Sequence, residues 1–152
     1  MSRSKPDGSA WLLAGGIASL LIAALHVVII AAGPRGYRYF GAANLVPLAE
    51  RGSPIPALLT AGVAVIFGIW GAYGLSGAGV IRPLPLIRTA LILIGVLFAL
   101  RGLILVQDLF RIAGGSLHPV RAAVFSAASL LIGLLYLLGV KARWPHLAPR
   151  RP

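Results

Sequence analysis

The chain has 152 residues, of which 59% are hydrophobic and only 11% are charged. Soluble domains carry about 25% charged residues, so a chain this poor in charge must present apolar side chains to lipid rather than to water. The formal net charge is +11, and the Lys and Arg residues lie mainly between apolar segments, where they would meet lipid headgroups. This distribution argues against nucleic-acid binding. The chain has no cysteine, which excludes disulfides and cysteine nucleophiles.

Four segments are long and apolar enough to cross a bilayer, which takes about 20 residues. They cover approximately residues 11–32, 55–75, 86–110 and 120–140. The loops and tails between them are too short for a soluble domain. The sequence therefore predicts an all-α polytopic membrane protein, a four-transmembrane-helix bundle that forms a single membrane domain over residues 1–152. The first segment exceeds the apolar core of a signal peptide, which is about 7–15 residues, so we interpret it as a membrane helix.

Turn-forming residues mark the ends of these segments. Gly33 and Pro34 predict the end of the first helix. Ser53 followed by Pro54 is typical of a helix N-cap and first helical position, and it predicts the start of the second helix. Small residues at four-residue spacing, such as Gly15 and Ser19 in the first helix, predict close helix–helix packing.

The first outer loop, between the first two helices, mixes cationic and aromatic side chains. Residues 44–51 predict a short interfacial helix with an apolar face among the headgroups. One interpretation is a lid over a site inside the bundle. The other, which we favour slightly, is an anchor that binds lipid headgroups through Arg35, Tyr37, Arg38 and Tyr39.

The balance of Lys and Arg predicts the orientation. With four crossings, both tails share a side of the membrane with the loop between the second and third helices. Eight cations fall on that side: Arg3, Lys5, Arg82, Arg88, Lys141, Arg143, Arg150 and Arg151. Five fall on the other: Arg35, Arg38, Arg51, Arg111 and Arg121. The positive-inside rule then places both termini in the cytoplasm.

Arg101 is the most informative residue, because residues 90–106 are otherwise all Ala, Leu, Ile, Val, Gly and Phe. A guanidinium at the centre of a membrane helix costs about 2.5–3.5 kcal/mol on insertion scales, so a compensating partner is required. A helical rise of about 1.5 Å per residue places Arg101 roughly 20 Å along the third helix from Arg88. The same count places His26, Thr60 and Ser126 at a similar depth, in the outer half of the membrane.

We therefore predict a polar ligand-binding layer in the outer half of the bundle. Asp108 follows Arg101 by seven residues on nearly the same helix face, and Glu50 in the outer loop is predicted to meet Arg101 or Arg38. The candidate ligand-binding residues are His26, Glu50, Thr60, Arg101, Asp108 and Ser126. The alternative is that Arg101, held by Asp108 or by helix-end carbonyls, only fixes the geometry of the bundle.

We expect no cofactor and no metal. A haem held by His26 and His118 is disfavoured, because His118 lies in a loop before a proline. A zinc site needs three or four ligands, and the His, Asp and Glu residues of this chain are too scattered along the sequence to supply them.

Several short stretches resemble a group of small bacterial four-helix inner-membrane proteins. The similar residues are 37–42 (Tyr-Arg-Tyr-Phe-Gly-Ala), 48–50, 52–53, 73–79 (Tyr-Gly-Leu-Ser-Gly-Ala-Gly) and 84–86. The resemblance covers the first three predicted helices. It implies the four-helix fold and a bacterial inner (cytoplasmic) membrane, and it implies no catalytic residue. Small multidrug exporters also have four helices, but they carry an acidic residue inside the first helix, where this chain has only His26.

Three classes of function fit these residues. The first, which we favour, is an accessory or binding protein whose polar site holds a lipid-like small molecule or a partner helix, with membrane lipids and a homo-oligomer or larger membrane complex as its partners. The second is a small transporter that moves protons or anions through His26, Arg101 and Asp108. The least favoured is an intramembrane isomerase, because acid–base chemistry needs two titratable groups near one carbon and no nucleophile motif is present.

Overall fold

The computed structural model describes residues 8–115 and 120–147, and these residues form helices and turns with no strand. The all-α prediction is therefore confirmed. The chain divides into two compact units, the first made of Met1–Ile17 with Ala72–Pro152 and the second of Ala18–Gly71. His118 and the outermost basic residues of both tails lie outside the described residues.

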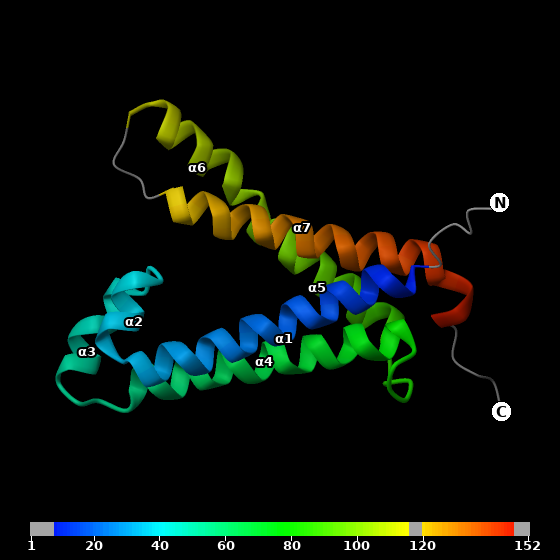
Figure 1. Cartoon of the computed structure of the whole chain (residues 1–152), viewed down its shortest axis with the longest axis horizontal. Helices are drawn as coiled ribbons and strands as arrows, with labels where there is room; N and C mark the ends of the chain where they lie inside the picture. Colours follow the sequence, from blue (N-terminus) through cyan, green and yellow to red (C-terminus); the bar gives the residue numbers. More distant parts are fainter. Residues whose placement is uncertain (1–7, 116–119, 148–152) are drawn as a thin grey trace. The chain divides into compact units, whose positions relative to one another are not determined.

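Nine helical elements follow one another along the described chain (Figure 1). They are α1 (Ser9–Ala32), α2 (Pro34–Tyr39), the 3-10 helix η1 (Ala43–Leu45), α3 (Val46–Glu50), α4 (Ile55–Ala78), α5 (Ile87–Gly102), α6 (Ile104–Ala113), α7 (Val120–Arg143) and the 3-10 helix η2 (Trp144–Leu147). Within these residues, four stretches are long and apolar enough to cross a membrane: Ser9–Ala32, Ile55–Ala78, Ile87–Ala113 and Val120–Leu147. The protein is a multi-pass membrane protein.

The local signals at the start of α4 act as predicted, but the helix ends later than expected. Ser53 Oγ accepts a hydrogen bond from the backbone N–H of Ile55 at 3.3 Å, as an N-cap does. The helix then continues to Ala78, three residues beyond the predicted end. The hydroxyl of Ser76 donates to the carbonyl of Arg82 and accepts from the N–H of Leu84, both at 2.9 Å. The Ser76 side chain therefore holds the loop that follows α4, while the backbone of Ser76 remains part of the helix.

The third membrane segment spans Ile87–Ala113, as the sequence predicts over residues 86–110, and it has one irregular position at Leu103. α5 ends at Gly102, Leu103 is a turn, and α6 begins at Ile104. The backbone N–H of Val106 donates to the carbonyl of Leu103, a contact one residue shorter than the α-helical one. Figure 1 shows α6 bending away from the line of α7 beyond this point.

Glycine at position 102 explains why the irregularity falls there. An ideal Cβ on Gly102 would lie 2.5 Å from the backbone nitrogen and Cα of Leu130 on α7, so only glycine lets the two backbones approach this closely. Glycine is also among the weakest helix formers. The contact with α7 therefore fixes this point of the chain, and the weak helix former allows it to bend.

In the first unit, the beginning of α1 and the end of α4 pack with α5 and α7 around Tyr136, which is completely buried. The rings of Phe98 and Tyr136 stack with centroids 6.2 Å apart. An ideal Cβ on Gly15 would lie 3.1 Å from the Tyr136 ring, and one on Gly74 would lie 2.5 Å from Cα of Gly16. Small residues thus set the helix spacing in this unit, as their spacing in the sequence predicts.

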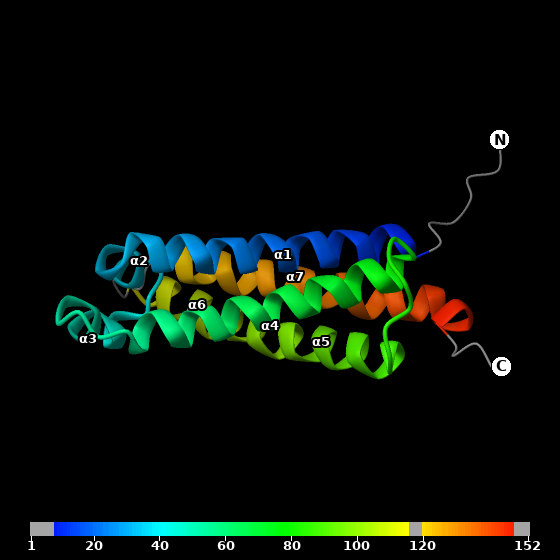
Figure 2. The same cartoon turned by 90° about the horizontal axis from the view of Figure 1, so that it is seen from below.

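In the second unit, α1 and α4 lie side by side and α2, η1 and α3 lie at one end of the pair (Figures 1 and 2). α2 is not predicted from the sequence, because Gly33 and Pro34 indicate a helix end. Gly33 does end α1, with a φ of 59°, but Pro34 also occupies the first turn of the next helix. The predicted interfacial helix over 44–51 is shorter than expected, since α3 covers only Val46–Glu50 after the 3-10 turn.

Candidate functional site

Three of the predicted polar residues come together in the first unit. The Nη1 group of Arg101, near the end of α5, donates to Oγ of Ser126 on α7 at 3.1 Å. The same Ser126 hydroxyl donates to Oδ2 of Asp108 on α6 at 2.7 Å. A serine hydroxyl can accept one hydrogen bond and donate another, so Ser126 links the Arg101 cation to the Asp108 carboxylate. We call Arg101, Ser126 and Asp108 the polar triad.

Burial differs sharply within the polar triad. Asp108 is 4% exposed and Ser126 is 1% exposed, whereas Arg101 is an exposed residue. Asp108 also has interactions beyond the one with Ser126. Ser126 is the one hydrogen-bonding partner of the Arg101 guanidinium within residues 8–115 and 120–147. Because a guanidinium carries five N–H donors, most of those on Arg101 have no protein acceptor in the described chain.

Arg101 lies well inside the membrane-spanning segment rather than near its ends. The span Ile87–Ala113 begins 14 residues before Arg101 and ends 12 residues after it. At about 1.5 Å per residue, these intervals correspond to roughly 21 Å and 18 Å of helix. Leu97, Leu100 and Ile104 on the neighbouring turns are all exposed. The exposed guanidinium edge is therefore surrounded by side chains that favour lipid.

The other predicted members of the polar layer belong to the second unit, and each has a local partner there. Nδ1–H of His26 donates to the carbonyl of Ile22 at 2.7 Å, and its ring lies 5.3 Å from that of Phe67. The hydroxyl of Thr60 donates to the carbonyl of Pro56, four residues earlier on the same helix. The single layer that would join them to Arg101 stays a prediction.

Glu50 binds Arg38, one of the two partners expected for it. Nη2 of Arg38 lies 2.7 Å from Oε1 of Glu50. Both side chains are more than half exposed, and exposed ion pairs typically contribute less than about 1 kcal/mol. The pair joins α2 to α3 and leaves Glu50 engaged within the second unit.

The residues predicted to contact lipid headgroups separate into two groups. Arg35, Arg38 and Tyr39 are exposed, as headgroup binding requires. Tyr37 is only 3% exposed and packs with Ile29 and Val46, so the structure does not place it where headgroups could reach it. Its hydroxyl is buried and has no hydrogen-bond partner among the described residues. The helical turn of α2, unforeseen in the sequence, turns this side chain inward.

The arrangement is an exposed cation joined through a serine hydroxyl to a buried carboxylate. A guanidinium with unused donors is suited to a carboxylate or phosphate. Within the described residues, no group of three or more His, Asp or Glu side chains is placed to hold a metal ion. Comparison with known proteins adds no precedent, because no family model, no curated protein and no solved structure matches the chain.

Proposed function

We propose that this protein is a binding or accessory protein of the bacterial inner membrane that holds the anionic group of a lipid-like amphiphile on Arg101. One observation carries the proposal: Arg101 is exposed inside a membrane-spanning segment, and Ser126 is its one partner in the described chain. A charged side chain at this depth is a functional-site hypothesis by default, because a purely structural cation would be expected to have its donors satisfied by the protein.

Ser126 and Asp108 support this role by fixing Arg101 without occupying its exposed edge. The buried carboxylate of Asp108 lies beyond the serine hydroxyl and offsets part of the positive charge through it. The serine holds one guanidinium nitrogen in place, which reduces the entropy lost when a ligand binds the others. The residue is thus oriented in advance for a two-point contact with a carboxylate or phosphate.

The surroundings favour an amphiphile over a water-soluble anion. Leu97, Leu100 and Ile104 are exposed around Arg101, so a ligand that reaches it must be apolar except at its anionic group. Arg101 is also roughly 18 Å of helix from the nearer end of its span, a depth that the headgroup of an ordinary bilayer lipid does not reach. A long-chain carboxylic acid has the required chemistry, and an acidic side chain on a partner helix is the runner-up.

Native mass spectrometry tests this proposal, with a long-chain fatty acid as the probe added to the purified protein in detergent. We expect the wild type to retain the fatty acid and Arg101→Leu to lose at least tenfold in affinity, since a charge-assisted contact contributes about 1.5–3 kcal/mol. Arg101→Lys should retain part of the binding. Arg51→Leu, which removes an exposed arginine outside the membrane-spanning helices, is the matched control. Equal binding by Arg101→Leu and the wild type would sink the proposal.

Proton or anion transport is the second candidate, and one observation favours it. The polar triad is a hydrogen-bonded chain that joins a cation on α5 to a buried carboxylate on α6. A transporter predicts pH-driven flux of protons or chloride in proteoliposomes, lost in Asp108→Asn. Binding of the fatty acid with no such flux supports the binding role instead.

The proposed orientation gives a second expected result. The chain contains no cysteine, so single substitutions report topology without background. We expect Arg51→Cys to react with a membrane-impermeant maleimide in intact cells, because its loop would face the periplasm. Arg82→Cys, in the exposed loop after α4, should react only after the inner membrane is permeabilised. The reverse pattern would show that the termini are periplasmic.

A further inference from the structure

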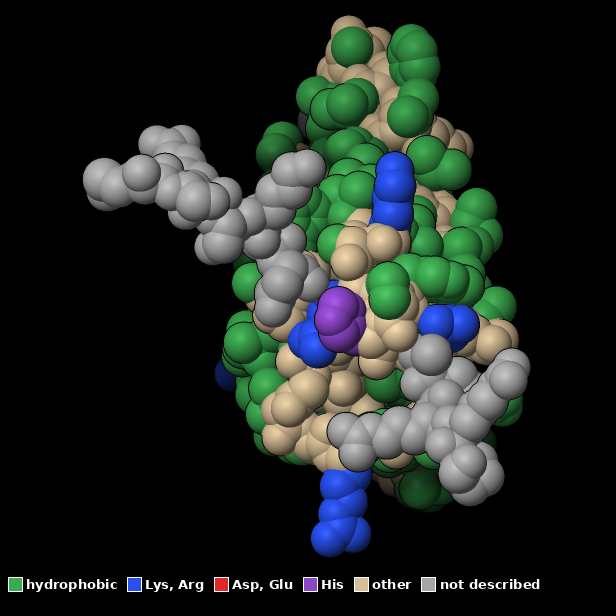
Figure 3. Space-filling model, turned by 90° about the vertical axis from the view of Figure 1, so that its right-hand side faces the viewer, with side chains coloured by type: hydrophobic (Ala, Val, Ile, Leu, Met, Phe, Trp, Pro, Cys, Tyr) green, Lys and Arg blue, Asp and Glu red, His purple; other side chains and the backbone are tan. Residues whose placement is uncertain are grey.

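A cationic end of the first unit lies where α5 begins and α7 finishes. Figure 3 looks onto this end and shows Lys and Arg side chains, with no Asp or Glu among the coloured side chains in that view. Four basic residues belong to it: Arg82, Arg88, Lys141 and Arg143. In the described chain the two carboxylates, Glu50 and Asp108, belong to other regions. The positive charge of this end is therefore uncompensated by the described protein.

Two of these cations hold the structure together. Nη2 of Arg88 donates to the carbonyl of Trp144 at 2.7 Å, and its guanidinium lies 4.4 Å from the centroid of the Trp144 ring. Nη1 of Arg143 donates to the carbonyl of Ala78 at 2.8 Å, which closes the end of α4. These contacts fix η2 and the end of α4, and they leave Lys141 and Arg82 as the cations of this end whose side chains make no hydrogen bond or ring contact with the described residues.

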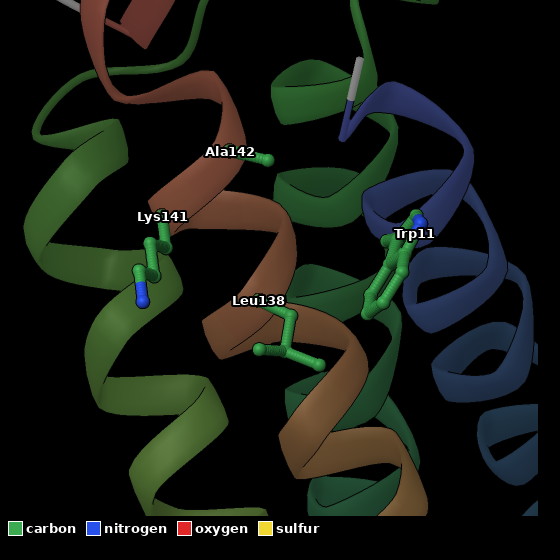
Figure 4. A pocket seen from close by; sticks show the side chains of 4 residues that line it. All are labelled: Trp11, Leu138, Lys141 and Ala142. Atoms are coloured by element: carbon green, nitrogen blue, oxygen red, sulfur yellow. The ribbon is translucent and has the colours of Figure 1, made fainter. Parts of the chain in front are cut away.

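Lys141 lines a shallow hollow of about 360 Å³ between the beginning of α1 and the end of α7. The other residues of the hollow are Trp11, Leu138 and Ala142 (Figure 4). Figure 4 shows Leu138 one turn from Lys141 on α7 and the indole of Trp11 approaching from α1. One indole and two aliphatic side chains thus face a single space at the end of two membrane-spanning helices, and Lys141 lies at its rim, on the side of α7 away from Trp11 (Figure 4).

We propose that this hollow seats one anionic glycerophospholipid. Its phosphate binds Lys141, and an acyl chain lies over Leu138, one turn deeper in the membrane on α7. The indole of Trp11 lies at the depth of the lipid ester groups, where tryptophan is enriched in membrane proteins. An anionic headgroup is favoured over a zwitterionic one, because the described part of this end offers cations for a phosphate and no carboxylate for a headgroup ammonium.

This seat is separate from the ligand proposed for Arg101. Lys141 lies 15 residues beyond Ser126 on α7, which corresponds to roughly 22 Å of helix. A headgroup at the membrane surface therefore does not reach the polar triad. The two proposals fail independently, since a variant of Lys141 leaves the Arg101 site unchanged.

Quenching of Trp11 by brominated lipids tests the seat in reconstituted vesicles. The chain has three tryptophans, and replacing Trp70 and Trp144 by phenylalanine leaves Trp11 as the reporter. We expect brominated phosphatidylglycerol, as a minor component of phosphatidylcholine vesicles, to quench Trp11 more than its bulk fraction allows. Lys141→Gln should weaken this preference about fivefold, the effect of removing one surface cation. Brominated phosphatidylcholine should quench both proteins alike.

Arg82→Gln is the matched control, because it removes a cation from the same end but outside the hollow. We expect it to preserve the preference, and free inorganic phosphate should not displace the lipid. Native mass spectrometry of the protein with all tryptophans intact gives a second measurement, in which Lys141→Gln should retain less phosphatidylglycerol. Equal quenching of Trp11 by the two brominated lipids, or an equal loss in Lys141→Gln and Arg82→Gln, would overturn the proposal.

Discussion

Replacing Gly133 by alanine is expected to lower the free energy of unfolding by about 2–3 kcal/mol, because it overpacks a contact between two helix backbones. An ideal Cβ at this position on α7 would lie 2.6 Å from the backbone nitrogen of Ala99 and 2.9 Å from the carbonyl oxygen of Gly95. Backbone atoms cannot rotate away as a side chain can. α5 and α7 would have to separate along a seam that also contains Phe98 and Tyr136.

Gly68→Ala is the matched control, because an ideal Cβ there meets nothing within 4 Å. We expect this substitution to be neutral or to stabilise by up to about 1 kcal/mol, since alanine is the better helix former. Both variants are compared with the wild type by denaturant titration in detergent micelles, followed by circular dichroism. If the two glycine variants unfold at the same denaturant concentration, the close α5–α7 contact is wrong.

Replacing Ser126 by alanine is expected to lower the free energy of unfolding by about 2 kcal/mol, because it removes two hydrogen bonds, one of them to the buried carboxylate of Asp108. The hydroxyl accepts from Arg101 and donates to Asp108, so its loss breaks both contacts at once. Ser129→Ala on the same helix is the control. The Ser129 hydroxyl donates to the carbonyl of Phe125 one turn earlier on the same helix. We expect its loss to lower the free energy of unfolding by well under about 1 kcal/mol.

A double-mutant cycle between Arg101→Leu and Ser126→Ala separates the bridge from other effects. We expect a coupling energy of about 1 kcal/mol in the denaturant titration, the range found for residues in one hydrogen-bonded network. The cost of Ser126→Ala should therefore be smaller when Arg101 is already leucine. Strict additivity of the two substitutions would contradict a serine bridge.

The sequence predicts the membrane helices because the length of an apolar segment is enough to identify a helix that can cross a bilayer. The irregularity at Leu103 also shows the limit of that signal. Gly102 and Leu103 are both compatible with a regular apolar helix, and the irregularity lies where Gly102 approaches Leu130 on another helix. Such a contact depends on the register between helices, which a single hydropathy pattern does not contain.

The candidate site shows the same division. Arg101 is conspicuous in the sequence, because one guanidinium interrupts an apolar run. Ser126 is predicted only by its depth, and its place between Arg101 and Asp108 depends on the rotation of α7. Tyr37 fails as a headgroup residue because the helical turn of α2 directs it inward beside Ile29. Composition therefore identifies the residues that need partners, and packing decides which partners they receive.

Photo-crosslinking beside Arg101 tests most directly whether this residue holds an anionic amphiphile. A benzophenone amino acid at Leu97, an exposed position one turn before Arg101, reports what lies against the guanidinium. In native membranes, we predict one dominant adduct whose mass corresponds to an acidic amphiphile, and its loss in the Arg101→Leu protein. Adducts with bulk phospholipid alone, in equal yield with and without Arg101, would contradict the account.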